Sequence, residues 1–199
     1  VTTDSPGLGG AIRIDAEAYV HNTLFADNYS AGQGGALWIG RGPATFENVT
    51  FFANHAAKWG GAISYSSQPI TLRNCTLAYN VADEGSDGLF GRAGPTPLVR
   101  NTIFYENGSG GNNRHCRHGL DGSNTIVYPA LATDTCGTHF DHSDPLLESE
   151  LADNGGFTQT LGLAASSPAL GMGTDCPATD QRGEPRDSTG CDLGAFELP

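Results

Sequence analysis

Basic residues are the scarcest charged class in this chain of 199 residues. It carries ten lysines and arginines against 22 aspartates and glutamates, which gives a net charge of −12 at pH 7, and Lys58 is its only lysine. A surface of this sign repels the phosphate backbone of nucleic acids and the headgroups of anionic membranes. We therefore expect no nucleic-acid partner.

Long apolar runs and helical periodicity are also missing. No segment reaches the roughly 18 consecutive apolar residues of a membrane-spanning helix, and no stretch of about 12 residues repeats its apolar positions with helical spacing. Helical crossovers between parallel strands are therefore not expected. The sequence also lacks the Gly-x-Ser-x-Gly elbow, the phosphate-binding loop and the His-Glu-x-x-His motif, so three common kinds of active site are excluded.

What the chain has instead is a repeat of about 26 residues. Two sets of asparagines and one set of glycines return at intervals of 25 to 27 residues. They are Asn22, Asn48, Asn74 and Asn101; Asn28, Asn54, Asn80 and Asn107; and Gly10, Gly35, Gly61 and Gly88. A constant interval of this length indicates a stacked array, in which neighbouring repeats bury each other's apolar face.

Within each repeat, apolar residues alternate with residues of the opposite face, as Ile12 and Ile14 do around Arg13. Alternation with a period of two indicates short strands. A second strand carries Ala18 and Val20, and a third carries the inward-facing set Phe25, Phe51, Leu77 and Phe104. We predict an all-β fold, a right-handed single-stranded parallel β-helix with about 26 residues in each rung, where a rung is one turn of the coil.

The repeated asparagines have a mechanical interpretation. Asparagine tolerates the left-handed backbone conformation, and its amide bonds the backbone at tight turns. Stacked in register, each set is predicted to form a ladder of amide bonds along the coil.

One domain spans residues 1–199, with regular rungs at 7–110, degenerate rungs and loops at 111–154, and an irregular C-terminal cap at 155–199. A coil exposes unpaired strand edges at both ends, and these edges need covering. We expect the cap to cover one end. The N-terminal end is expected to be uncapped and available for assembly.

Four of the five cysteines lie in the irregular half of the chain, which indicates an oxidising compartment. We predict disulfides between Cys116 and Cys136 and between Cys176 and Cys191. Cys75 stands at a core position and is expected to be free and buried.

The repeats resemble those of bacterial polymorphic outer-membrane and pectin-lyase-like β-helix proteins, with Gly60-Gly61-Ala62-Ile63 and the Phe51-x-x-Asn54 spacing as examples. The closing segment resembles the end of choice-of-anchor Q domain proteins. Its matching stretches are Asn154-Gly155-Gly156-Phe157-Thr158-Gln159-Thr160-Leu161, Ser167-Pro168-Ala169-Leu170, Asp180-Gln181-Arg182-Gly183 and Cys191-Asp192-Leu193-Gly194-Ala195-Phe196-Glu197. These resemblances imply a secreted, periplasmic or cell-surface bacterial protein. They supply no common catalytic motif and leave the function open.

Two groups of side chains carry candidate chemistry. Carboxylates at Asp83, Asp87 and Asp121 suit glycan hydrolysis or a calcium ion if they converge. Imidazoles at His115, His118, His139 and His142 lie near two cysteines and suit zinc or copper. The simpler interpretations, which we prefer, are a solvated acidic loop and a disulfide-linked loop with exposed histidines, so no cofactor is expected.

Outward-facing aromatic residues offer a binding surface for a glycan or a protein. They are Trp38, Trp59, Phe52, Tyr79 and Tyr105. We therefore favour a noncatalytic extracellular β-helix, a structural, adhesive or accessory subunit of an envelope assembly that contacts a protein or glycan. Two alternatives remain: a polysaccharide lyase or glycoside hydrolase on this scaffold, and an extracellular metal-binding protein that uses the histidine and cysteine cluster.

Overall fold

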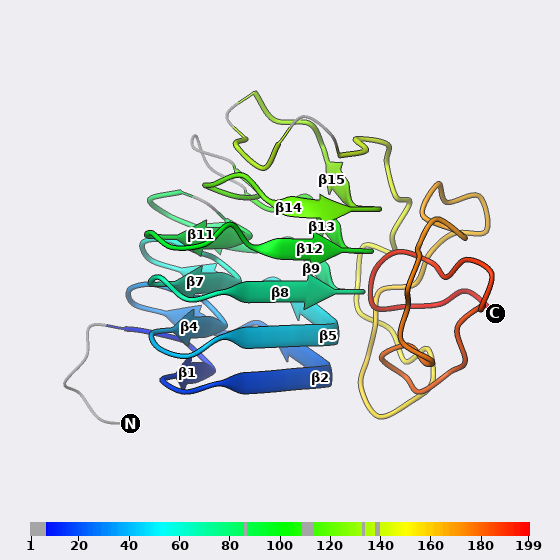
Figure 1. Cartoon of the computed structure of the whole chain (residues 1–199), viewed down its shortest axis with the longest axis horizontal. Coiled ribbons are helices and arrows are strands. Elements are labelled where there is room, and N and C mark those ends of the chain that lie inside the picture. The colour runs from blue at the N-terminus through cyan, green and yellow to red at the C-terminus, as the bar shows by residue number, and fades with distance from the viewer. Residues whose placement is uncertain (1–6, 86, 109–113, 133, 138–139) are drawn as a thin grey trace.

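The computed structural model describes residues 7–85, 87–108, 114–132, 134–137 and 140–199. Its strands wind upward as a right-handed parallel coil (Figure 1), and this confirms the predicted fold. One sheet stacks β1 (Ile12–Ile14), β4 (Leu37–Ile39), β7 (Ile63–Tyr65) and β11 (Leu89–Gly91). The largest sheet contains β2 (Ala18–Ala26), β5 (Ala44–Phe52), β8 (Ile70–Arg73), β9 (Thr76–Ala78), β12 (Leu98–Arg100), β13 (Ile103–Tyr105), β14 (Asp121–Ser123) and β15 (Ile126–Tyr128).

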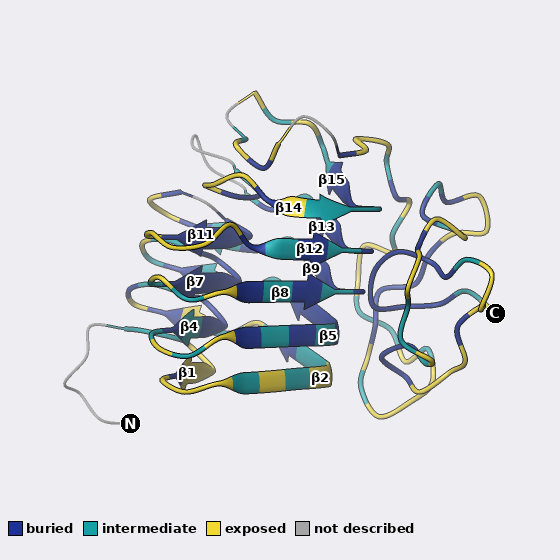
Figure 2. Cartoon of the chain, in the orientation of Figure 1, coloured by how far each residue is buried: buried dark blue, intermediate teal, exposed yellow. Residues whose placement is uncertain are grey.

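The predicted register is confirmed in the core. Phe25 pairs with Phe51, Phe51 with Leu77, Leu77 with Phe104, and Phe104 with Val127. All five side chains are buried inside the coil, and the rings of Phe25 and Phe51 stack with centroids 5.2 Å apart. Because every rung places an apolar side chain over the one below, the core continues along the coil axis (Figure 2).

The strand lengths differ from the prediction. The second and third strands of the first two rungs are continuous nine-residue strands, β2 and β5, that run through the turn asparagine. A third sheet of two-residue strands was not predicted: β3 (Tyr29–Ser30), β6 (His55–Ala56) and β10 (Val81–Ala82). Two residues are too few for alternation to appear in a sequence.

The first asparagine set has the predicted backbone conformation. Asn22, Asn48, Asn74, Asn101 and Asn124 all have φ between 48° and 53°, in the left-handed region that asparagine tolerates. At the second set, the left-handed conformation occurs in the residue before each asparagine. These residues are Asp27, Ala53, Tyr79 and Glu106, whose φ lies between 46° and 56°. The second set therefore stabilises these turns through its side chains.

That second set forms an unbroken ladder of amide bonds. The Nδ2 of Asn28, Asn54 and Asn80 donates to the Oδ1 of the asparagine one rung above, at 2.8, 2.9 and 2.8 Å respectively. The backbone N–H of each donates to the same oxygen at 3.1 Å. Asn107 closes the ladder against the buried His115 ring, with Nδ2 and Nδ1 3.3 Å apart.

The predicted glycine column is confirmed for Gly10, Gly35 and Gly61. A Cβ on Gly35 would lie 2.0 Å from the carbonyl oxygen of Gly61, and a Cβ on Gly10 would lie 2.1 Å from that of Gly35, so no side chain fits at these two positions. The prediction is wrong for Gly88: because Ile63 pairs with Leu89, Asp87 takes the fourth position, and a Cβ on Gly61 would lie 2.4 Å from its carbonyl oxygen.

The C-terminal segment, residues 155–199, is irregular and disulfide-bonded as predicted, but it lies along the flank of the coil (Figure 1). We expected it over the end. It covers the outward face of the third strands, where Thr50, Thr76, Ile103 and Ile126 point away from the coil interior and are nonetheless buried. Ile103 and Ile126 form a second apolar cluster with Leu193 and other residues of this segment. An apolar outward face explains why the segment packs sideways.

Both predicted disulfides form, and Cys75 is free and buried. Burial raises the pKa of the Cys75 thiol to about 12. This thiol therefore stays protonated and serves as a small core side chain.

We predict that Asn80→Ala destabilises the protein by about 3 kcal/mol, because it leaves the backbone and side-chain N–H groups of Asn54 without their acceptor. For a chain of this size the melting temperature should fall by about 6–12 °C, measured by circular dichroism.

The matched control is Asn28→Ala, at the half-buried start of the ladder, where water can replace the lost donors. It should lose about 1 kcal/mol or less. Equal losses in the two variants would contradict a stabilising role for the buried ladder.

Candidate functional site

The candidate carboxylates are not brought together. Asp87 is buried below β11 and accepts hydrogen bonds from the backbone N–H groups of Ala82 at 2.7 Å and Arg114 at 3.0 Å. Burial raises its pKa above the usual value. Asp83 is exposed and bonds His55 at 2.8 Å, whereas Asp121 lies in a different sheet, on the exposed start of β14. Asp87 thus stabilises a turn, and the three carboxylates share no site.

The histidines are dispersed in the same way. His115 is fully buried, with Nδ1 facing the amide of Asn107 and Nε2 donating to the Pro129 carbonyl at 3.1 Å. His118 and His142 are exposed, and His139 lies outside the described residues. The described part of the chain contains no cluster of three or more histidine, cysteine or acidic side chains that could hold a metal ion.

Burial also sets the charge of His115. It lowers the pKa of the imidazole to about 4, so the ring is neutral at physiological pH. Protonation would place a second donor on Nδ1, against the Asn107 amide. Burial raises the pKa of Asp134, whose carboxylate accepts from the His115 backbone N–H at 2.6 Å, to about 6.

The five predicted contact aromatics divide into two groups. Phe52, Tyr79 and Tyr105 form a row along the ends of the third strands, and Tyr128 continues it, with successive ring centroids 5.4 to 5.8 Å apart. Tyr105 and Tyr128 pack against the apolar cluster beneath the C-terminal segment. The end of this row at Tyr105 and Tyr128 therefore has a structural role.

Trp38 lies on the first sheet, and Trp59 lies beside it. Trp38 pairs with Arg13 and Ser64 in the predicted outward column, is half-buried, and lies under the Arg13 guanidinium at 4.6 Å. Trp59, from the turn before β7, stacks on Phe90 with centroids 5.3 Å apart and planes 13° from parallel. Between them Ser64 donates to the Gln33 side chain at 3.1 Å.

Two members of this face, Phe90 and Arg117, were missed in the sequence. Phe90 pairs with Ser64, so it continues the column of Trp38. Arg117 follows Cys116, which bridges Leu89, and its guanidinium lies over the Phe90 ring at 5.1 Å. The 26-residue interval from Trp38 to Ser64 leads on from Ser64 to Phe90 and could have identified it, but Arg117 lies beyond the decay of the repeat. A pocket of about 230 Å³ opens between Trp59, Phe90, Arg92 and Arg117.

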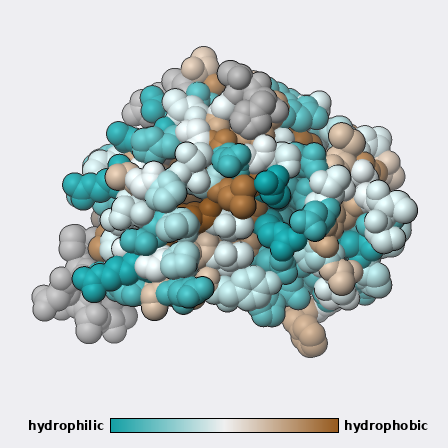
Figure 3. All heavy atoms as spheres, in the orientation of Figure 1, coloured by the Kyte–Doolittle hydropathy of each residue, from teal (hydrophilic) through white to brown (hydrophobic). Residues whose placement is uncertain are grey.

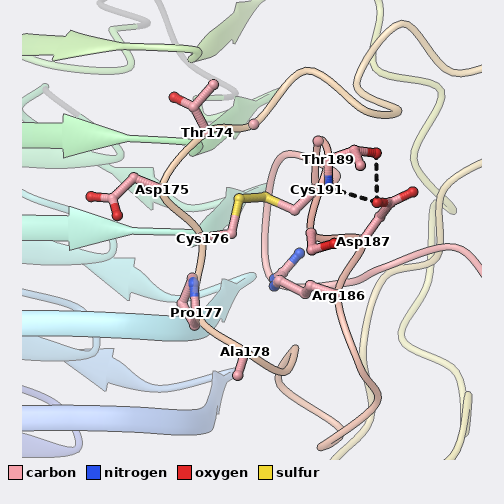
Figure 4. Close-up of a pocket in the computed structure, with 12 residues that line it drawn as sticks. Thr174, Asp175, Cys176, Pro177, Ala178, Arg186, Asp187, Thr189 and Cys191 are labelled. Atoms are coloured by element: carbon pink, nitrogen blue, oxygen red, sulfur yellow. Dashed lines mark hydrogen bonds between the residues drawn. A yellow bond between two sulfur atoms is a disulfide. The ribbon is translucent and has the colours of Figure 1, made fainter.

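A cavity of about 580 Å³ lies in the C-terminal segment between residues 173–178 and 186–191. The Cys176–Cys191 disulfide crosses it, and Asp187 bonds Thr189 on its rim (Figure 4). The buried guanidinium of Arg186 forms an ion pair with Glu197 of the same segment at 2.8 Å and donates to Asn48 Oδ1 at 3.0 Å. The bond to Asn48 joins the segment to the coil.

Elsewhere the face seen in Figure 3 is mainly hydrophilic, with a small hydrophobic area near its middle. Among the described residues, none forms a helix of the length and apolarity that crossing a bilayer demands.

Comparison with known families gives one match. Residues 22–40 and 48–66 match the model of the Chlamydia polymorphic membrane protein repeat. Each matched stretch runs from a turn asparagine through the Gly-Gly turn into the first strand of the next rung. No curated protein and no solved structure matches the chain. The chain is thus a parallel β-helix with rungs similar to the polymorphic membrane protein repeat.

We predict that His115→Gln changes the pH dependence of stability. The folded pKa of about 4 lies below the usual 6.5, so the unfolded chain binds the proton more tightly, and the wild type loses this contribution as pH falls from 6.5 to 4. The loss is at most about 3 kcal/mol, because one pH unit between the two pKa values is worth about 1.4 kcal/mol.

The variant lacks this loss, so its free energy of unfolding should rise relative to that of the wild type as pH falls. Asp134 titrates with the opposite sign but is present in both proteins, and its contribution largely cancels. Urea unfolding at pH 4.5, 5.5 and 7 measures the difference. A constant difference would mean that folding does not lower the pKa of His115.

Proposed function

We propose that this chain is a noncatalytic module of the bacterial cell surface, and that it holds a rigid lateral face for adhesion or envelope assembly. The observation that carries the proposal is the repeat match, because the matched family is named for membrane proteins. The resemblance of residues 154–197 to choice-of-anchor Q proteins supports the same location. Two disulfides fit an oxidising compartment.

The state of the candidate chemical groups supports a noncatalytic role. Asp87 bonds backbone N–H groups, His115 closes the asparagine ladder, and Cys116 and Cys136 are joined to each other. Each has a structural role, whereas Trp38, on the first sheet, and Trp59, in the turn before β7, are both partly exposed. A preordered aromatic surface binds a partner with little loss of conformational entropy.

Location is tested with antibodies against the folded chain. Intact bacteria that produce the protein should be labelled as strongly as permeabilised ones, and added protease should remove the signal. Labelling only after permeabilisation would refute the surface location.

The contact face is tested by substitution. Beads coated with the chain should bind to cells or matrix, and Trp38→Ala should weaken this binding by about 5- to 100-fold if the indole is a central contact. Phe157→Ala, which removes a fully exposed aromatic from the C-terminal segment, is the matched control. Equal binding by both variants would exclude this face, and a large drop in melting temperature for Trp38→Ala would assign the indole to the core.

A further inference from the structure

Arg92 and Arg117 stand out in the charge distribution of this acidic protein. Four of its ten basic side chains, Arg13, Arg73, Arg182 and Arg186, form ion pairs with carboxylates. Arg92 and Arg117 are exposed, line the same pocket, and form no ion pair within the described residues. Two unpaired guanidinium groups at one pocket, on a chain of net charge −12, make this place locally attractive to carboxylates.

The pocket wall is ordered by stacking along the coil. The ring of Phe90 is buried, and its centroid lies 5.3 Å from that of Trp59 and 5.1 Å from the guanidinium carbon of Arg117. The backbone of Phe90 is fixed in β11. Arg117 is held by the bridge between Cys116 and Leu89 and by the disulfide to Cys136. The apolar and cationic groups are therefore positioned before any partner arrives.

A second pocket, of about 300 Å³, adjoins the first. Tyr65 forms part of its lining, together with His118, Gly119 and the exposed loop 93–97. Gly91 makes room for the Tyr65 ring, because a Cβ there would lie 2.2 Å from it. The two pockets are neighbours because Arg92 and Arg117 line the first, and the next residues, Ala93 and His118, line the second.

The volumes of the two pockets and the positive charges of their arginines indicate what kind of partner they bind. Small-molecule sites usually enclose about 300–1,000 Å³, so pockets of about 230 and 300 Å³ each suit a single side chain. Tryptophan and arginine are the residues that most often dominate protein–protein contacts. We propose that these paired pockets bind an acidic peptide segment of a protein partner, with a carboxylate on Arg92 and Arg117 and an apolar side chain against Trp59. This inference rests on the proposed surface function and names its partner chemistry.

The two tryptophans allow a direct test. In Trp38→Phe the only indole is Trp59, so fluorescence reports on the pocket alone. We would titrate this variant with an octapeptide of alternating glutamate and leucine, and in parallel with the same peptide carrying glutamine in place of glutamate. The acidic peptide should shift the emission with saturation, and the glutamine peptide should not. In Trp59→Phe the shift should disappear.

Arginine variants in the Trp38→Phe background locate the carboxylate. Arg92→Gln and Arg117→Gln should each weaken the acidic peptide about tenfold or more, as loss of a charge-assisted hydrogen bond predicts. Arg41→Gln removes another exposed arginine and should change nothing. Unaltered melting temperatures would confirm that the variants are folded.

Three results would overturn the inference: no saturable shift, equal weakening by Arg41→Gln, or displacement of the peptide by a heparin octasaccharide with tighter binding, which would assign the site to glycans. A surface-labelled protein that fails these titrations would lose only this inference. A protein that binds the peptide but is never surface-labelled would lose the proposed function.

Discussion

Amide side chains that bond along the coil axis hold each rung of this protein on the next. Asn54, Asn80 and Asn107 are buried, and each joins its neighbours through side-chain and backbone donors to one shared oxygen. Such a ladder needs every rung to have the same length and register, because a shift by one residue would leave buried amides without partners. The inward stack of Phe51 on Leu77 and the close glycine contacts depend on the same register.

The flank of the coil depends on a different set of interactions. Asp180 bonds Arg182 at 2.8 Å, and Glu197 bonds Arg186 at the same distance, with all four groups buried. Gln181 reaches Thr50 at 2.7 Å, and Arg186 reaches Asn48 at 3.0 Å. Both ion pairs lie within the C-terminal segment and stabilise its own conformation, whereas the bonds to Thr50 and Asn48 set its position on the coil, since any other position would leave these buried polar groups without partners. Gln181 and Arg186 therefore attach the C-terminal segment to β5.

These structural roles shape what the protein can do. Among the described residues, Asp87, Asn107, His115 and the bonded cysteines stabilise turns, and ordered aromatic side chains lie on and beside the first sheet. Trp38 and Phe90 are held there by backbone register, Trp59 stacks on Phe90 from the preceding turn, and Arg117 is added from the irregular part of the chain. A rigid face of this kind loses little conformational entropy when it binds a partner.

The sequence by itself determined the coil, its period and its inward columns, because each follows from spacing: a repeated interval fixes register, and register fixes which side chains stack. The cysteine positions also indicate the two disulfides, but their spacing alone leaves the pairing open. The sequence also indicated the left-handed asparagines. It did not reveal that Ala53 and Tyr79 share that conformation, since neither residue type marks it. Only the tertiary structure decided what lies beyond the repeat: that the C-terminal segment covers the flank, that His115 closes the ladder, and that Arg117 joins Trp59. Those contacts connect residues whose separation in the sequence follows no period, so the repeat does not predict them.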